Sequence, residues 1–148
     1  MENCNEICDN IFVGNKLSLE NPHQYSLIIN CTPSIPFPLC NTEYIRVAVN
    51  EHVPSNNDMF AILYNNGILE RIKHHADNNN SILINCNQGI QRSSAVCACY
   101  LVKYLSFTPM KAINHIKSKR PIAFQDNINF LETIKKFNTK KYKNIKID

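Results

Sequence analysis

A thiol, a guanidinium group and a hydroxyl group lie close together in the middle of the chain. Cys86 is followed after five residues by Arg92 and then directly by Ser93, with Gly89 between them. A cysteine thiolate is a strong nucleophile, and the planar fork of an arginine matches two oxygens of a phosphate group. Glycine lets a loop curl because it adopts backbone conformations that other residues avoid. These residue types at this spacing predict a nucleophile beneath a bound phosphate.

The segments on either side of this motif predict a strand, a loop and a helix. The apolar run 82–84 suits a buried strand, and the run 95–105 is long enough for a buried helix. The first N–H groups of a helix have no partners within it and lie at the positive end of its dipole, so this turn suits an anion and a thiolate. We expect a phosphate-binding loop formed by Asn87, Gln88, Gly89, Ile90, Gln91 and Arg92.

Patterns elsewhere in the chain predict an α/β fold. We expect strands at Ile11–Val13, Leu27–Cys31, Tyr44–Val49 and Ile82–Asn85. We expect helices at Asp58–His75, Ser93–Leu105, Pro109–Lys119 and Asn127–Phe137, with Thr108 and Asp126 as caps of the last two. Strands mixed with helices favour a central, mostly parallel sheet of about four to five strands flanked by helices on both faces. Ligands bind at the carboxyl ends of the strands in such sheets, where Cys86 falls.

The composition is that of one globular domain. The 148 residues are 44% hydrophobic, and we expect residues 1–148 to form a single domain with flexible tails at 1–6 and 139–148. No apolar run approaches a membrane span, and the N-terminus lacks a signal-peptide core. Seven cysteines without a scaffold spacing indicate reduced thiols, so we expect a cytoplasmic or otherwise reducing intracellular compartment. We expect no cofactor, and no metal because Cys4 and Cys8 have no second ligand pair.

The order Cys86, five residues, Arg92 and Ser93 resembles the signature of the cysteine-dependent protein phosphatases. The surrounding sequence is similar to the compact dual-specificity phosphatases, including their viral members, whose compartment would be the host cell. The matching segments are 11–15, 26–32, 44–49 and 119–121, followed by Asn127 and Phe130. The resemblance covers about residues 7 to 138 and implies a protein-tyrosine-phosphatase-like fold.

The resemblance also implies roles for three side chains. Cys86 would attack phosphorus and form a phosphocysteine, while Arg92 and the loop amides stabilise the charge on the phosphate oxygens. Ser93 would donate a hydrogen bond to the Cys86 sulfur and help it leave in the second step. The family's acid follows the strand that here ends at Val49, which places Glu51 at that position. Asp58 is the alternative acid, although a carboxylate at the start of a helix is commonly a cap, and a third alternative is that there is no dedicated acid.

One residue departs from the family pattern. Asn85 stands where the family usually has a histidine before the nucleophile. An asparagine can make hydrogen bonds to the loop through its amide, but it carries no titratable charge. We therefore expect a less acidic Cys86 and a slower turnover than in typical relatives.

The loop composition favours a protein substrate. Its side chains other than Arg92 are uncharged, whereas relatives that favour inositol phosphates tend to carry lysines there. We expect a protein phosphatase that acts on phosphotyrosine and on phosphoserine or phosphothreonine. The alternatives are a weak or inactive phosphate-binding pseudophosphatase and an RNA 5′-phosphatase. The lysine-rich C-terminus fits a solvated tail, so the sequence favours neither a nucleic acid nor a membrane as partner, and it leaves the oligomeric state open.

The remaining cysteines and histidines have simpler interpretations. Ile29, Asn30 and Cys31 repeat the triplet that ends at Cys86, but neither glycine nor arginine follows at the needed spacing, so Cys31 is expected to be structural. We expect Cys40, Cys97 and Cys99 to be buried as small apolar side chains, and His74 and His75 to face solvent.

Overall fold

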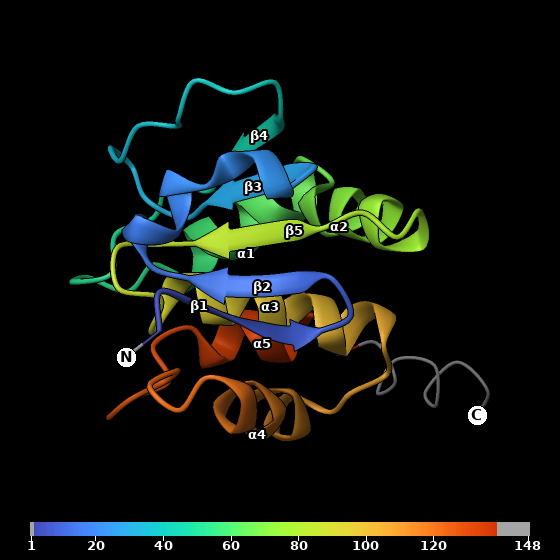
Figure 1. Cartoon of the computed structure of the whole chain (residues 1–148). Coiled ribbons are helices and arrows are strands. Elements are labelled where there is room, and N and C mark those ends of the chain that lie inside the picture. Colours follow the sequence, from blue (N-terminus) through green and yellow to red (C-terminus); the bar gives the residue numbers. More distant parts are fainter. Residues whose placement is uncertain (1, 139–148) are drawn as a thin grey trace.

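Five strands form one sheet in the order β1-β2-β5-β3-β4 (Figure 1). The computed structural model describes residues 2–138. The strands are β1 (Cys4–Cys8), β2 (Ile11–Gly14), β3 (Leu27–Asn30), β4 (Glu43–Arg46) and β5 (Ile82–Asn85). The pairs β2–β5, β5–β3 and β3–β4 are parallel, and β1 joins β2 antiparallel. The predicted mostly parallel sheet is confirmed, with β5 at its centre.

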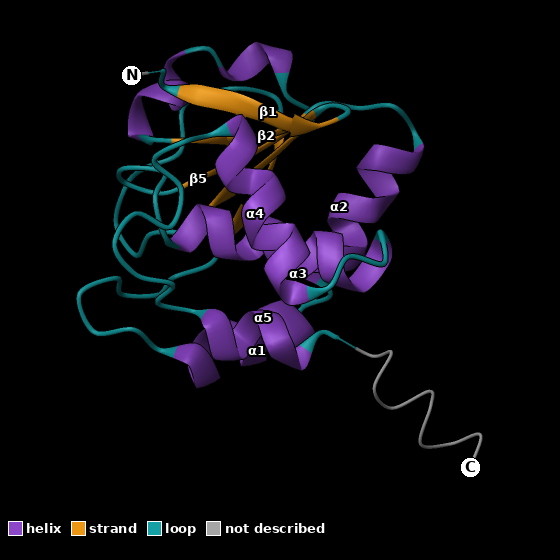
Figure 2. Cartoon of the chain, turned by 90° about the horizontal axis from the view of Figure 1, so that it is seen from below, coloured by secondary structure: helices purple, strands orange, loops and turns teal. Residues whose placement is uncertain are grey.

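Seven helical segments surround the sheet. They are η1 (Lys16–Glu20) and η2 (Pro22–Gln24), which are 3₁₀ helices, and the α-helices α1 (Asn56–Asn65), α2 (Ile68–Asp77), α3 (Arg92–Tyr104), α4 (Pro109–Lys119) and α5 (Leu131–Lys136), all within residues 2–138. The α-helices lie on one side of the sheet (Figure 2). Because successive strand residues point to opposite faces, Ile29 and Ile84 pack in the large core beneath these helices, while Ile28 and Leu83 pack in a smaller cluster on the other face.

The smaller cluster is covered by short segments. Leu19 of η1 and Tyr25, just after η2, are buried in it, and Phe12 and Tyr44 pack against it from the strands. The two faces are thus covered differently, by α-helices on one side and by 3₁₀ helices on the other.

The helix predicted at Asp58–His75 is two helices. Gly67 has a φ of +61°, a left-handed conformation that an α-helix cannot continue through, so the chain ends α1 and restarts as α2. The buried face of α2 includes His75, which lies 3.0 Å from Glu43 of β4. The prediction that His75 faces solvent is therefore wrong, whereas His74 is exposed.

The last predicted helix also starts later than expected. Thr108 caps α4 as predicted, since its hydroxyl accepts from the N–H of Lys111. Asp126, however, has a φ of +70° and caps nothing; α5 begins only at Leu131. The backbone at 125–129 is instead engaged by the side chain of Gln91, which bonds three of its polar groups.

Two further boundaries differ from the predictions. Residues 4–6, expected to be part of a tail at 1–6, belong to β1, because Cys4–Cys8 pairs along the free edge of β2. The strand predicted at Tyr44–Val49 ends at Arg46, since the N–H of Val49 donates to the C=O of Val47 (3.0 Å) in a tight turn. The predicted tail at 139–148 lies outside the described residues. Among residues 2–138, no helix is both long and apolar enough to cross a lipid bilayer.

Candidate active site

The predicted strand, loop and helix unit is present. Cys86 follows the last residue of β5, and α3 begins at Arg92, so the loop lies at the carboxyl end of the central strand. The Cys86 sulfur lies 3.2 Å from the Ser93 hydroxyl and accepts a hydrogen bond from the N–H of Gly89, also at 3.2 Å. The thiol is buried beneath the loop, where its sulfur accepts from a backbone N–H and lies within hydrogen-bond distance of a hydroxyl.

Arg120 holds two carbonyl groups of the loop from outside. Its Nε donates to the C=O of Gly89 (2.8 Å), and its Nη2 donates to the C=O of Gln88 (3.2 Å). Its Nη1 donates to the C=O of Glu2 and to Oδ1 of Asn5, and the side chain is almost completely buried. Burial lowers the pKa of Arg120, while the nearby Cys86 thiol acts in the opposite direction. A planar guanidinium can bridge neighbouring carbonyls in this way because its donors form a fixed fork.

Backbone donors hold the two flanking carbonyls. The N–H of Lys16 donates to the C=O of Asn87 (3.1 Å), and the N–H of Phe124 donates to the C=O of Ile90 (2.9 Å). Four successive carbonyls, from residue 87 to residue 90, thus bond to groups outside the loop. In a trans peptide the N–H of the next residue points away from the carbonyl. The N–H groups of residues 88 to 91 therefore point away from these external partners, and that of Gly89 bonds the Cys86 sulfur.

Gly89 is required by both its conformation and its surroundings. Its φ is +70°, in the left-handed region that favours glycine. A Cβ at this position would lie 2.7 Å from Nη2 of Arg120 and 2.7 Å from the backbone of Gly14. Any side chain there would push the loop away from the two groups that it packs against.

Arg92 is the charged group at the mouth of the loop. Its Nη1 donates to the C=O of Val49 (3.0 Å), and its Nη2 lies 3.7 Å from a carboxylate oxygen of Glu51. Its Nε is buried and has no protein partner among residues 2–138. The guanidinium is thus fixed by the turn after β4 and keeps a donor that a phosphate oxygen can accept from.

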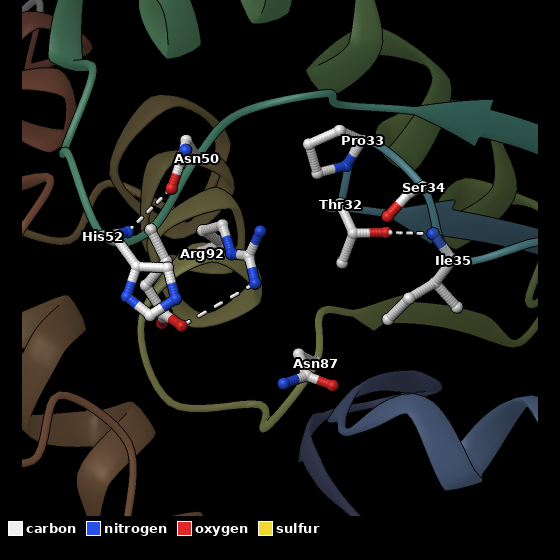
Figure 3. A pocket seen from close by; sticks show the side chains of 9 residues that line it. Thr32, Pro33, Ser34, Ile35, Asn50, His52, Asn87 and Arg92 are labelled. Atoms are coloured by element: carbon white, nitrogen blue, oxygen red, sulfur yellow. Dashed lines mark hydrogen bonds and ion pairs between the residues drawn. The ribbon is translucent and has the colours of Figure 1, made fainter.

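A pocket of about 320 Å³ opens above Arg92 (Figure 3). One wall is the segment that follows β3, where Thr32 accepts from the N–H of Ile35 (3.1 Å) and Arg46 donates to the carbonyls of both residues. The other wall is the segment that follows β4, and Asn87 of the loop lies at the base. The lining residues are Thr32, Pro33, Ser34, Ile35, Asn50, Glu51, His52, Asn87 and Arg92.

The chain matches known phosphatase domains over most of its length. The family model described as "Dual specificity phosphatase, catalytic domain" matches residues 11–140. The chain belongs to the dual-specificity phosphatase family. It is 26% identical over 133 residues to human dual specificity protein phosphatase 14, covering 84% of this chain and 64% of that protein. The chain thus spans slightly less than two thirds of this relative's length.

Two other matches cover nearly the whole of both partners. The putative tyrosine phosphatase 123R of Invertebrate iridescent virus 6 is 26% identical over 136 residues, which is 89% of each chain. The crystal structure of human DUSP28 superposes with a TM-score of 0.82 at 21% identity, covering 96% of this chain and 97% of that one. The compact viral-like dual-specificity phosphatase predicted from the sequence is confirmed as the family and the fold.

The two candidate acids of this dual-specificity phosphatase domain lie in different places. Glu51 lines the pocket and contacts Arg92, and its position is fixed by a turn in which the N–H of His52 donates to Oδ1 of Asn50 (2.9 Å). Asp58 is an exposed residue in the first turn of α1 and does not line this pocket. The structure therefore brings Glu51, and not Asp58, to Arg92 and the loop.

The amide of Asn85, which could have bonded to the loop, does not do so. Its side chain is completely buried, and neither Oδ1 nor Nδ2 has a partner among residues 2–138. As a strand residue next to Cys86 it points to the other face of the sheet, where its register partner Asn30 bonds to Thr32 and Ile35 instead. The position before the nucleophile thus holds a polar group that the loop does not use.

Two residues act on the loop in ways that the sequence did not reveal. Gln91 was expected to line the phosphate site, but its side chain is buried against the segment 125–129, where it donates to the C=O of Asn127 (2.5 Å) and accepts from the N–H of Asn129 (3.0 Å). Only the backbone of Gln91 is therefore part of the phosphate-binding loop. In the sequence, Arg120 was noted only as part of the segment 119–121 that resembles the family. Its position directly before Pro121 was the one signal that could have identified it as a residue that acts on the loop.

The other cysteines differ in burial. Cys31 follows Asn30, the register partner of Asn85, and is completely buried next to Cys86. Burial raises the pKa of Cys31 well above its ordinary value, and the Cys86 thiol acts in the same direction, so Cys31 stays protonated. Cys97 and Cys99 are buried in α3 as predicted. Cys40 is only partly buried, which corrects its prediction, because it lies in the proline-rich surface segment near His23 and Thr42.

Proposed function

We propose that this chain hydrolyses phosphate monoesters on the tyrosine, serine and threonine side chains of proteins. The observation that carries this proposal is the outward orientation of the carbonyls from residue 87 to residue 90, which leaves the N–H groups of residues 88 to 91 on the inner side of the loop that holds the Cys86 sulfur. Fixed donors aimed at a transferring phosphoryl group stabilise the transition state because they need no reorganisation as charge develops.

In the first step the Cys86 thiolate attacks phosphorus. A sulfur–phosphorus bond forms, the bond between phosphorus and the side-chain oxygen of the substrate breaks, and Glu51 donates a proton to that leaving oxygen. Arg92 and the loop N–H groups bind the three remaining phosphate oxygens throughout. The covalent intermediate divides one difficult displacement into two easier ones.

In the second step water replaces the sulfur. Glu51, now a carboxylate, takes a proton from the water as its oxygen attacks phosphorus, and the sulfur–phosphorus bond breaks. Ser93 stabilises the departing thiolate, since its hydroxyl lies 3.2 Å from the sulfur. Inorganic phosphate leaves and the free enzyme is restored.

The pocket supports a single phosphate on a protein side chain. It is open on one side and its walls are formed by segments 32–35 and 50–52, so it can admit both long and short phosphorylated side chains. Among its lining residues, the basic ones are Arg92 and the titratable His52. So few positive charges suit a substrate that carries a single phosphate better than one that carries several. Because the nucleophile must stay reduced, we propose a reducing intracellular compartment.

The test is hydrolysis of an aryl phosphate and of phosphotyrosine and phosphothreonine peptides. We expect turnover on all three, and Cys86→Ser should reduce it by at least roughly 10⁴-fold because the nucleophile is lost. Cys97→Ser is a matched control, since it removes a buried thiol of α3 that is not in the loop. Wild-type protein without turnover would overturn the proposal.

The unpartnered amide of Asn85 favours a second candidate, a phosphate-binding pseudophosphatase. Such a protein would retain the loop and lack efficient chemistry. It predicts that wild-type protein captures phosphopeptides with micromolar affinity while releasing no phosphate, and that Arg92→Met abolishes the capture.

A further inference from the structure

A second, smaller pocket lies beside the phosphate-binding loop, on the side of η1. Its volume is about 210 Å³, and three of its lining residues are aliphatic: Leu17, Ile90 and Ile122. We call it the side pocket. Leu17 is 46% exposed, although a leucine is ordinarily buried, and Ile90 and Ile122 are partly exposed. The side pocket is smaller than the roughly 300 Å³ at which pockets for whole ligands begin, so it fits a single side chain.

The side pocket adjoins the candidate active site. Asn87 lines both pockets, and Gln88 and Ile90 of the loop belong to the side pocket. The wall formed by η1 is fixed to the loop, because the N–H of Lys16 donates to the C=O of Asn87 (3.1 Å). An extended peptide advances about 3.3–3.6 Å per residue, so a chain that crosses Asn87 reaches the side pocket within one or two residues of the phosphorylated position.

The chemistry of the lining selects an apolar side chain. The three aliphatic residues form its surface, and Lys16 is the charged residue at its rim. Within residues 2–138 no carboxylate lines it, so a phosphorylated peptide, which is itself anionic, meets no repulsion from these lining residues. Removing Leu17, Ile90 and Ile122 from water against a leucine, isoleucine or methionine of the substrate is favourable.

We propose that the side pocket binds a large aliphatic side chain located one or two residues from the phosphorylated residue of a protein substrate. This inference rests on the proposed function and specifies its substrate class. Leu17 and Ile122 are then specificity-determining residues, and they act by contact with the substrate.

The experiment compares phosphotyrosine peptides in a glycine and serine background, with one leucine placed in turn at positions −2, −1, +1 and +2. We expect kcat/KM at one of these positions to exceed that of the leucine-free peptide by about 5- to 20-fold, as partial burial of a leucine predicts. In the variants Leu17→Ser and Ile122→Ser, the ratio of kcat/KM between the leucine-containing and the leucine-free peptide should fall toward one.

Leu105→Ser is the matched control, because Leu105 is 43% exposed and lies at the end of α3, outside both pockets. It should leave the ratio unchanged. A ratio near one at all four positions in the wild type would overturn the proposal, and so would a ratio that persists in both pocket variants. A stronger gain from a second phosphorylated residue than from leucine would also overturn it and would assign the side pocket to an anion held by Lys16.

The two proposals fail separately. Aryl phosphate hydrolysis reports the reaction alone, since that substrate has no flanking residue. If no variant turns over any substrate, the same peptides can be bound to Cys86→Ser and their affinities measured by fluorescence anisotropy. The ratio of affinities between the leucine-containing and the leucine-free peptide then tests the side pocket without any reaction.

Discussion

Arg92 and Glu51 face each other across the candidate active site with 3.7 Å between their nearest polar atoms. In the reaction that we propose, a bound phosphate competes with Glu51 for the guanidinium, and the Glu51 carboxyl group lies beside the leaving oxygen. The turn at residues 50–52 places the Glu51 side chain at the pocket wall. Asp58, in contrast, is an exposed residue of α1.

Glu51→Gln should lower kcat by roughly 10²–10⁴-fold for phosphopeptides, because their leaving oxygen needs a proton. The loss should be smaller for an aryl phosphate with an acidic phenol as leaving group. Asp58→Asn, made in parallel, should change both rates less than twofold. Steady-state kinetics with phenols of graded pKa measure this, and an equal loss in both variants would contradict the assignment of the acid.

Asn85→His should raise kcat by about 3- to 10-fold, since a protonated imidazole on the residue before Cys86 adds a positive charge whose field favours the thiolate, even from the other face of the sheet. It also replaces two buried polar atoms that have no partner among residues 2–138. Pre-steady-state measurement of phosphocysteine formation would attribute the gain to the first step. Asn30→His on the neighbouring strand serves as a control, and an equal gain there would exclude a local effect on Cys86.

At the scale of the elements, the loop is shaped by segments that are distant in the sequence. Arg120, at the end of α4, donates to the carbonyls of Gln88 and Gly89, while η1 and the segment after α4 bond the two flanking carbonyls. The sequence around Cys86 supplies the nucleophile and the glycine, but the orientation of the loop amides depends on these external donors.

Arg120→Lys tests this dependence, because lysine keeps the charge but cannot bridge two carbonyls with a planar fork. We expect kcat/KM for an aryl phosphate to fall roughly 10²-fold, as displacement of a preorganised site implies. The affinity for tungstate, measured by calorimetry, should fall in parallel, which a purely structural loss outside the loop would not produce. Lys119→Arg is the control for the neighbouring position.

A second connection joins the edge strand β4 to α2. Nε of Arg71 donates to Glu43 at 2.9 Å, and His75 lies 3.0 Å from the same carboxylate. The hydrogen bonds from Arg71, and to a smaller extent from His75, lower the pKa of Glu43 from 4.5 to about 2, against the effect of burial. The interaction thus favours the charged carboxylate in the folded state.

This connection should contribute to acid stability. Because the pKa of Glu43 is lower in the folded state, its contribution is present above about pH 4.5 and is lost as the pH falls toward 2. Glu43→Gln should lower the free energy of unfolding by about 1 kcal/mol at pH 7, a value reduced by the partial exposure of the pair. Urea titrations at pH 7, 4 and 2.5 should show the two proteins converging at acid pH; a constant difference would contradict this account.

The sequence predicted local features better than contacts between distant segments. The apolar runs located four strands, and the spacing of Cys86, Gly89 and Arg92 located the loop, because each of these signals lies within one short segment. Three contacts could not be predicted from residue spacing. They are the pairing of Cys4–Cys8 with β2, the hydrogen bonds of the Gln91 side chain to the backbone at 125–129, and the bonds from Arg120 to the loop. They depend on which segments meet once the chain has folded.

At the scale of the whole molecule, the candidate site joins the sheet, the segments after β3 and β4, and α3 in one cooperative unit. A ligand that binds only the folded state stabilises the whole unit, by about 2.7 kcal/mol at a concentration 100 times its dissociation constant. Saturating tungstate, a tetrahedral oxyanion, should therefore raise the Tm by about 5–10 °C for a domain of this size.

Two variants separate binding from chemistry in this measurement. Cys86→Ser should retain most of the rise in Tm, because the loop amides and Arg92 are intact. Arg92→Met should lose it. A rise that Arg92→Met retains would place the anion elsewhere on the molecule.

The bonds from Lys16, Arg120 and Phe124 to the loop carbonyls also have a consequence for gene fragments. A premature stop codon shortly before residue 120 would leave every residue of the signature motif in the translated product, yet its loop would lack three of its four external hydrogen-bond donors to these carbonyls. Such a truncated product would be recognised by motif searches as a phosphatase and would be unable to hold an oxyanion. Supplying the missing C-terminal segment as a separate polypeptide should restore oxyanion binding if the two pieces associate.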